Sequence, residues 1–332
     1  MKKTCFRFLV VIVALFAVFS VHSVYFGFAD GNYVYLGGMP SGFALETRGA
    51  HVIGLCDVVG KDGVYSPAKS AGVNVGDILL KIDDTEVNTA EEIEQALKKV
   101  GDKAVLTVSR GGEKIVLEIT PAVDAMGAKK LGLFVRSAVN GIGTITYIDL
   151  KMNFGSLGHP VLTEDGALLE VSGGKVYACN ITGYVKGERG VPGELRGLFL
   201  RDKSIGTIEK NTRTGVYGVL DEGHGMALNR IKVAKEGAAK VGEAKIYTTI
   251  DGVTPKEYRI SIVKVDQANP DNKNLVIKIT DKDLLENTGG ILQGMSGSPI
   301  VQGGALIGAV THVFVNDPTR GFGILAENMI GK

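Results

Sequence analysis

Short apolar runs with strand-like alternation, separated by glycine turns, fill the chain from Lys129 to the C-terminus. The 332 residues include 46 glycines, about twice the usual share of roughly 7%. The runs are Leu131–Val135, Ile142–Ile148, Lys175–Val185, Gly197–Phe199, Gly215–Val219, Lys245–Ile250, Glu257–Val265, Leu275–Thr280 and Ala305–Phe314. Many short strands with regular turns are typical of a sandwich or barrel. Because closed barrels leave no exposed strand edges, we expect a mainly β region of two paired antiparallel barrels.

The stretch from about Asn32 to Thr120 reads instead as strand, turn, strand, helix and strand. Within it, Pro67–Leu79 resembles the PDZ signature of bacterial envelope proteases, in which a helix of small residues is followed by a Gly-acidic-x-apolar motif that opens a strand. Thr89 and Glu92 match a capping box for a second helix, which Gly101 closes. Length also favours two domains, since single cores stop growing near roughly 250–300 residues. The sequence therefore predicts a small α+β PDZ domain over residues 30–122 and a second domain over 123–332.

A PDZ domain accepts a peptide by strand addition beside its second helix. Ser41–Leu45 resembles the loop whose N–H groups hold a terminal carboxylate, with Leu45 opening the strand that pairs with the peptide. Small apolar-glycine loops are common, so an ordinary loop is the alternative. We nevertheless expect Gly42, Phe43 and Leu45 to bind peptide.

The N-terminus carries an export pattern. Lys2, Lys3 and Arg7 precede a run from Phe8 to Val21 that is apolar except for Ser20. A positive region before a run of this length is typical of a secretory signal, while an extended run would give a marginal membrane anchor. We expect residues 1–29 to act either as a signal peptide or as a membrane anchor.

Charge and cysteine content exclude several classes of function. Thirty-seven basic and 36 acidic residues leave a net charge of +1, which is not the footprint of a nucleic-acid-binding protein. The three cysteines fit no zinc spacing, and one of them lies in the leader. We therefore expect no cofactor, no metal ion and no nucleic-acid partner.

The segment Gly294–Pro299, with the sequence GMSGSP, carries the strongest chemical signal. A serine nucleophile needs its Oγ raised from the backbone beside N–H groups aimed at the developing oxyanion, and glycine permits the required bend. The pattern resembles the nucleophile loop of chymotrypsin-like peptidases. By that resemblance Ser296 is the nucleophile, and the N–H groups of Gly294 and Ser296 form the oxyanion hole. An ordinary Gly/Ser turn is the alternative.

Such a serine needs a histidine base and an acid that orients the imidazole. Of the five histidines, His159 lies at a turn between two expected strands, where its side chain can enter a cleft. His312 ends the strand after Ser296, so we expect it, with Thr311, to wall the substrate pocket. That strand carries no acidic residue, which favours a small or apolar substrate side chain before the cut.

The acid is less clear from the residues alone. Asp165 and Asp251 lie in Asp-Gly turns, which explain them structurally. Asp281 ends an apolar strand fifteen residues before Ser296. It fits an orienting acid and, equally, the N-cap of a short helix from Lys282 to Glu286.

Several long segments together resemble the SpoIVB peptidases, serine endopeptidases of endospore-forming bacteria. The matching segments are Gly141–Thr144, Phe154–His159, Gly190–Gly197, Ile208–Thr212 and Thr288–Ile300. The resemblance places the family's catalytic residues on His159, Asp281 and Ser296. Two departures are Pro160, where glycine is expected, and Met295, where trypsin-type enzymes have aspartate. We therefore expect activity without a newly formed N-terminus buried beside Ser296.

The resemblance implies a signalling protease of sporulation. Its members are made in the forespore and cross its membrane into the intermembrane space, where they are initially anchored. They then cleave themselves and cut a membrane-embedded regulator, which triggers intramembrane processing of a late mother-cell sigma factor precursor. The PDZ domain would restrain the protease or deliver it to that regulator. The alternatives are a general envelope quality-control protease, whose PDZ domain normally follows the protease domain, and a non-catalytic PDZ scaffold.

Overall fold

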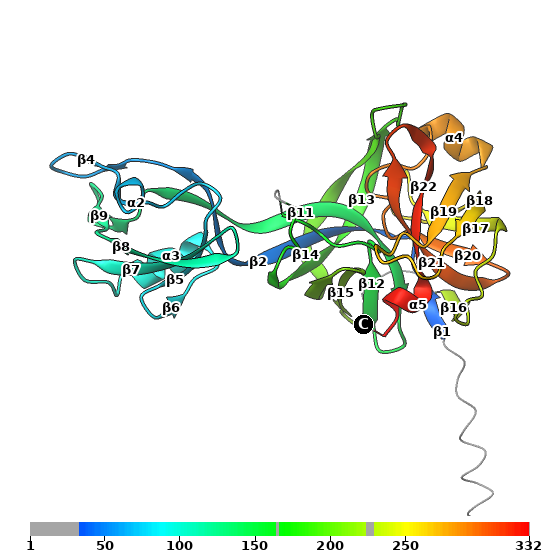
Figure 1. Ribbon diagram of the computed structural model, residues 1–332, viewed down its shortest axis with the longest axis horizontal. Coiled ribbons are helices and arrows are strands. Elements are labelled where there is room, and N and C mark those ends of the chain that lie inside the picture. Colours follow the sequence, from blue (N-terminus) through cyan, green and yellow to red (C-terminus); the bar gives the residue numbers. More distant parts are fainter. Residues whose placement is uncertain (1–32, 164–165, 224–228, 332) are drawn as a thin grey trace, which may run out of the picture.

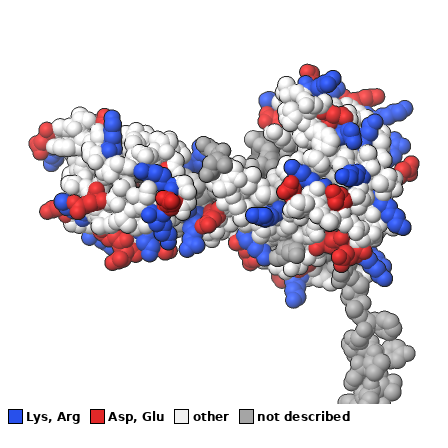
Figure 2. Space-filling view, viewed as in Figure 1, with Lys and Arg blue, Asp and Glu red and all other residues white. Residues whose placement is uncertain are grey.

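The structure is a computed structural model that describes residues 33–163, 166–223 and 229–331. It shows a mainly β chain with a small body and a large body, joined by a narrow two-stranded ribbon (Figure 1). On the face shown in Figure 2, basic and acidic side chains are interspersed over both bodies. The predicted signal peptide or anchor at residues 1–29 lies outside the described residues. Among those described, no helix has the length and hydropathy needed to cross a membrane.

The small body has an α+β core. Its elements are β3 (Val58–Val59), β4 (Val64–Tyr65), α2 (Pro67–Ser70), β5 (Ile78–Ile82), β6 (Thr85–Glu86), α3 (Ala90–Leu97), β7 (Ala104–Arg110), β8 (Glu113–Ile119), β9 (Ala122–Val123) and β10 (Lys129–Lys130). The Thr89 side chain accepts a hydrogen bond from the Glu92 N–H at the start of α3, as expected. Ile93, Ala96 and Leu97 of α3, which recur at helical spacing, pack into the buried core of this body.

The connecting ribbon consists of β2 (Pro40–Leu55) and β11 (Leu133–Ile148), which pair antiparallel from Leu55 and Leu133 at one end to Pro40 and Thr144 at the other. The small body is therefore inserted between two strands of the large body. Residues 33–47, expected to belong to the PDZ domain, lie in the large body instead. The reason is burial, since Phe43 and Leu45 pack into a hydrophobic cluster of the large body.

Six strands around that cluster form a ring of pairings, which we call the first ring. In ring order they are β2, β11, β12 (Asn153–Ser156), β15 (Gly215–Leu220), β14 (Glu194–Thr212) and β13 (Val171–Val185), which pairs again with β2. Phe43, Ile145, Phe154 and Val176 are buried within it. His159 lies three residues beyond the end of β12.

A second ring of six pairings follows in the sequence. In ring order its strands are β17 (Gly242–Thr248), β18 (Lys256–Val265), β19 (Leu275–Ile279), β22 (Asp317–Leu325), β21 (Ala305–Phe314) and β20 (Pro299–Gln302), which pairs again with β17. Helices α4 (Lys282–Thr288) and α5 (Ala326–Met329) lie on this side of the molecule. Strands β1 (Tyr33–Leu36) and β16 (Asn229–Val233) link the rings, because β1 pairs with β11 and β16, and β16 pairs with β21. Ser296 lies just before β20.

Candidate active site

The loop that carries Ser296 requires glycine at defined positions. Gly294 and Gly297 have φ angles of 96° and 94°, in the region that side chains rarely adopt. A Cβ on Gly297 would lie 2.0 Å from the carbonyl oxygen of Thr144. Met295 between them is fully buried in the second ring. The loop backbone can therefore bend against the first ring only because Gly297 has no side chain.

Strand β11 of the first ring holds this loop by three hydrogen bonds. The Thr144 N–H donates to the Ser296 carbonyl at 2.9 Å. The hydroxyls of Thr144 and Thr146 donate to the carbonyls of Gly294 and Gly297 at 3.0 and 2.7 Å. The nucleophile loop beside the second ring is thus held by the first ring, through hydrogen bonds between residues about 150 positions apart in the sequence.

His159 is presented by a tight turn after β12. Leu157 and Gly158 both have positive φ angles, of 64° and 69°. A Cβ on Gly158 would lie 2.8 Å from Ile324 Cγ2, on the second ring, so the turn packs closely between the rings. His159 Nδ1 lies 2.9 Å from the Pro160 carbonyl oxygen. Because a carbonyl only accepts, Nδ1 carries the hydrogen and Nε2 is free to take up a proton.

A pocket of about 440 Å³ brings the two side chains together. His159 and Ser296 both line it, and so do Gly294, Thr311 and His312. Its remaining wall is largely apolar and includes Phe43, Leu45, Val139, Ile142, Leu157, Val161, Pro192, Ile291, Leu292, Val313 and Val315. In this state the Ser296 hydroxyl donates to the Thr311 carbonyl at 2.6 Å. Hydrogen bonds between catalytic groups often form only when substrate binds.

Two backbone donors beside Ser296 are available. Over the described part of the chain, neither the Gly294 N–H nor the Ser296 N–H donates a hydrogen bond, whereas the Met295 and Gly297 N–H groups donate to the Leu292 and Val310 carbonyls. Donors left open in a preformed loop are suited to stabilise an oxyanion.

Burial lowers the pKa of His159 below its ordinary value of 6.5, and the hydrogen bond with Pro160 opposes this shift only in part. The imidazole is therefore neutral at neutral pH, which is the form that accepts a proton from serine.

Asp281 occupies the N-cap of α4. Its carboxylate accepts hydrogen bonds from the N–H groups of Leu284 and Arg259, each at 3.2 Å, and lies 3.5 Å from Arg259 Nε. Burial would raise its pKa, but these bonds outweigh burial and lower it. Among the described residues, Asp281 does not line the Ser296 pocket and no hydrogen bond joins it to His159. The orienting role expected of Asp281 stays a prediction.

Gly42, Phe43 and Leu45 lie outside the small body, so the expectation that they bind peptide in a PDZ groove is corrected. They belong to the part of β2 that pairs with β11 and β13. A Cβ on Gly42 would lie 2.6 Å from the Phe199 ring, and Phe43 and Leu45 instead help to line the Ser296 pocket. The local pattern fits a loop, but pairing with distant strands decides where it lies.

A groove of about 320 Å³ lies on the small body between α3 and the start of β11. Ile93 and Leu97 of α3 line one side, and Leu131, Leu133 and Val135 line the other. Within the described chain, Leu133–Val135 pair with β2 along one edge only, which leaves the geometry needed for strand addition. The sequence signal for it is Gly132 followed by the apolar run Leu133–Val135.

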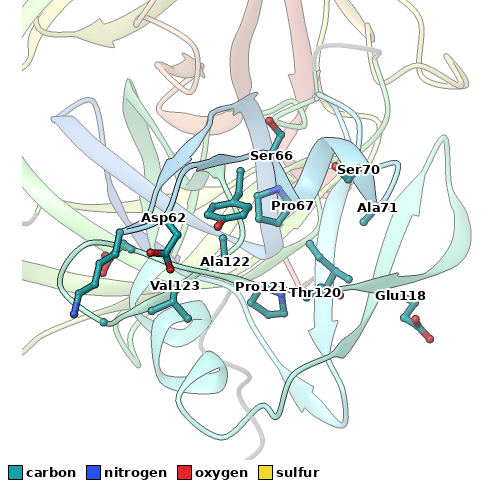
Figure 3. A pocket seen from close by; sticks show the side chains of 15 residues that line it. Asp62, Ser66, Pro67, Ser70, Ala71, Glu118, Thr120, Pro121, Ala122 and Val123 are labelled. Atoms are coloured by element: carbon teal, nitrogen blue, oxygen red, sulfur yellow. The ribbon is translucent and has the colours of Figure 1, made fainter.

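A larger cavity, of about 640 Å³, lies on another face of the small body. Figure 3 shows Ser66, Pro67 and Ser70 on one side of it and Pro121, Ala122 and Val123 on the other. Its lining includes neither histidine nor cysteine. Across the described residues, no group of three or more potential metal-ligating side chains was found.

Comparison with known proteins also divides the chain into two parts. A family model described as SpoIVB peptidase S55 matches residues 127–330, and one described as PDZ domain matches residues 52–120. The predicted PDZ domain is thus confirmed, and its family match precedes that of the peptidase along the chain. Serine protease HTRA1 of Xenopus tropicalis is 32% identical over 79 residues, which is 24% of this chain and 16% of that protein. Among solved structures, the PDZ domain of an SdrC-like protein from Listeria monocytogenes is 20% identical, covers 26% of this chain and 87% of its own, and gives a TM-score of 0.21.

Proposed function

The chain belongs to the SpoIVB peptidase S55 family, and we propose that it is a serine endopeptidase with Ser296 as nucleophile and His159 as general base. The observation that carries the proposal is one pocket shared by both side chains, each supplied by a different ring. The open N–H groups of Gly294 and Ser296 support it further.

The geometry supports the following acyl transfer. On substrate binding, the Ser296 hydroxyl leaves the Thr311 carbonyl and passes its proton to His159 Nε2 as Oγ attacks the scissile carbonyl. The tetrahedral oxyanion accepts hydrogen bonds from the N–H groups of Gly294 and Ser296. His159 then donates the proton to the leaving amine, and water hydrolyses the acyl-enzyme by the reverse sequence. The Pro160 carbonyl holds the required tautomer in the resting site.

The family resemblance assigns the orienting acid to Asp281. We retain that assignment as a proposal to be tested by substitution, because the carboxylate caps α4 in the resting structure. If Asp281 orients His159, the Asp281→Ala variant must lose the reactivity of Ser296 while it keeps its fold.

We propose a protein substrate, with an apolar or small side chain before the cut. The apolar wall of the pocket, formed by residues such as Ile291, Leu292 and Val313, supports this choice. An extended segment of a protein partner would bind in the groove between α3 and β11 of the PDZ domain.

The family and the leader sequence support a specific biological role. We propose that the protein is exported across the forespore membrane, is initially anchored through its N-terminal segment, and cleaves itself. It would then cut a membrane-embedded regulator recruited through the PDZ domain, and so trigger intramembrane processing of a late mother-cell sigma factor precursor.

The first experiment is active-site labelling of protein lacking residues 1–29, beside Ser296→Ala, His159→Ala and Asp281→Ala. Each protein is incubated alone and with a fluorophosphonate probe and analysed by intact mass, with circular dichroism to verify folding. We expect one adduct and self-cleavage in the wild type, and neither in Ser296→Ala or His159→Ala. A folded wild type that forms no adduct and cleaves nothing would contradict the proposal. Labelling retained by Asp281→Ala would remove Asp281 from the mechanism and leave Ser296 and His159 in place.

A further inference from the structure

His312 lies beside the proposed base. The ring centroids of His159 and His312 are 4.6 Å apart, and their planes are inclined by 37°. His312 follows Thr311 on β21, and the Thr311 carbonyl accepts the hydrogen bond of Ser296. One strand therefore contacts both members of the proposed catalytic pair.

The other contacts of His159 leave a role for this ring. The hydrogen bond from Nδ1 goes to the carbonyl of the next residue in sequence, Pro160. A single bond to an adjacent residue fixes the tautomer but restrains the tilt of the imidazole poorly. No carboxylate lines this pocket among the described residues. A flat ring stacked against His159 restricts that tilt.

The stacking partner must also tolerate a positive charge. His159 becomes an imidazolium when it takes the proton of Ser296, and a cation is stabilised by a neutral aromatic face but repelled by a second cation. The His312 side chain lines the pocket and is partly exposed to solvent. Partial burial, the neighbouring His159 and the charge of Lys273 all lower its pKa. The His312 ring is therefore neutral at neutral pH.

We propose that His312 is a positioning residue, which stacks on His159 and holds the imidazole toward Ser296 through the proton transfer. This inference rests on the proposed serine endopeptidase function. It goes beyond a pocket-wall role because it ties His312 to the turnover step rather than to substrate binding.

The test compares His312→Phe, His312→Ala and His312→Arg in protein lacking residues 1–29, with kcat and KM for a peptide substrate and the pH dependence of fluorophosphonate labelling. His312→Ala should lower kcat by about tenfold or more with little change in KM, and His312→Phe should recover most of that loss because it restores a flat neutral ring. His312→Arg places a permanent charge beside His159, so it should slow labelling and move its acid limb to lower pH.

Equal losses in His312→Ala and His312→Phe, a loss confined to KM, or wild-type kcat in His312→Ala would each overturn the inference. These outcomes leave the proposed function intact, provided that wild-type protein is labelled at Ser296. A wild type that is never labelled would instead contradict the proposed function, and the role of His312 with it. Circular dichroism of each variant separates loss of positioning from loss of folding.

Discussion

Glycine residues set the geometry of the nucleophile loop. Gly297 has both a positive φ angle and a neighbouring carbonyl 2.0 Å from where a Cβ would stand. Its own carbonyl accepts the hydrogen bond of the buried Thr146 hydroxyl. A change at this residue therefore disturbs the contact between the rings as well as the loop.

We predict that Gly297→Ala abolishes fluorophosphonate labelling and lowers the free energy of unfolding. The added methyl group must displace either the backbone of Thr144 or the loop that carries Ser296. Gly183→Ala is the matched control, because a Cβ there meets no atom within 4 Å and its φ is not strained. Labelling of Gly297→Ala at the wild-type rate would contradict this reading of the loop.

The pH dependence of labelling should report His159. Because the pKa of His159 is lowered, the imidazole stays neutral and Ser296 stays reactive to a pH below 6.5. Reactivity is then lost as the pH falls through the pKa of His159. The rate of labelling between pH 4 and 8 measures this directly, and Ser296→Ala should remain unlabelled throughout. Half-maximal labelling above pH 6.5 would mean that burial does not dominate at His159.

Sequence reasoning reached some of these residues and missed others for a physical reason. Nucleophile loops and turn histidines leave local patterns, which is why sequence reasoning singled out Ser296 and His159, and the structure brings both side chains to one pocket. The bond from Ser296 to the Thr311 carbonyl left none, since any residue supplies a carbonyl. The stacking of His312 on His159 depends on how two rings pack, which a local pattern does not encode.

At the level of elements, helix α4 bears on the two sequence hypotheses for Asp281, an N-cap and an orienting acid, and the structure supports the N-cap. The predicted N-cap is present, with the Asp281 carboxylate accepting from the Leu284 N–H and Gly289 closing the helix at a φ of 75°. The helix thus explains Asp281 without catalysis, while the orienting role has no contact behind it in the resting structure.

Asp281→Ala should therefore lower the free energy of unfolding by about 1 kcal/mol, the usual effect of losing an N-cap. Asp283→Ala is the control within the same helix, because Asp283 does not serve as the cap. Chemical denaturation of both variants measures the difference. Equal stability of the two variants would contradict the capping role.

Element boundaries were predictable where local signals set them. Helix α3 begins after its capping Thr89 as expected, but it ends at Leu97 with Lys98 as its C-cap, and Gly101 does not close it. The run predicted as Ile142–Ile148 and all but the first two residues of the run Leu131–Val135 instead belong to one long strand, β11. Its middle residues pair with β2 in the ribbon and are half-buried or exposed, so their polar and glycine-containing sequence resembles a turn. Pairing over a distance overrides that local signal.

The whole molecule is a peptidase body interrupted by a PDZ domain. The insertion enters along β2 and leaves along β11. Strand β11 lines both the PDZ groove and the Ser296 pocket, and β2 lines the Ser296 pocket. Length and composition predicted two domains, but the interruption required knowing which strands pair.

This topology predicts opposite results for two deletions. Replacing residues 47–137 by Asn-Gly should preserve labelling at Ser296, because Glu46 and Ala138 are register partners and Asn-Gly closes two-residue hairpins. A chain beginning at residue 127 should not fold, because it lacks β1 and β2. Labelling with the probe and circular dichroism distinguish these results. A folded, labelled chain from residue 127 would contradict the assignment of β2 to the first ring.

The position of β1 and β2 also limits how the protein can mature. Removal of the leader before Tyr33 would leave every described strand in place, so trimming there is compatible with an intact enzyme. A cut followed by release of the segment before β11 would strip the first ring of a wall and remove Phe43 and Leu45 from the pocket. The proposed self-cleavage would therefore leave the Ser296 pocket intact where it falls before Tyr33, and would dismantle that pocket where it releases β2.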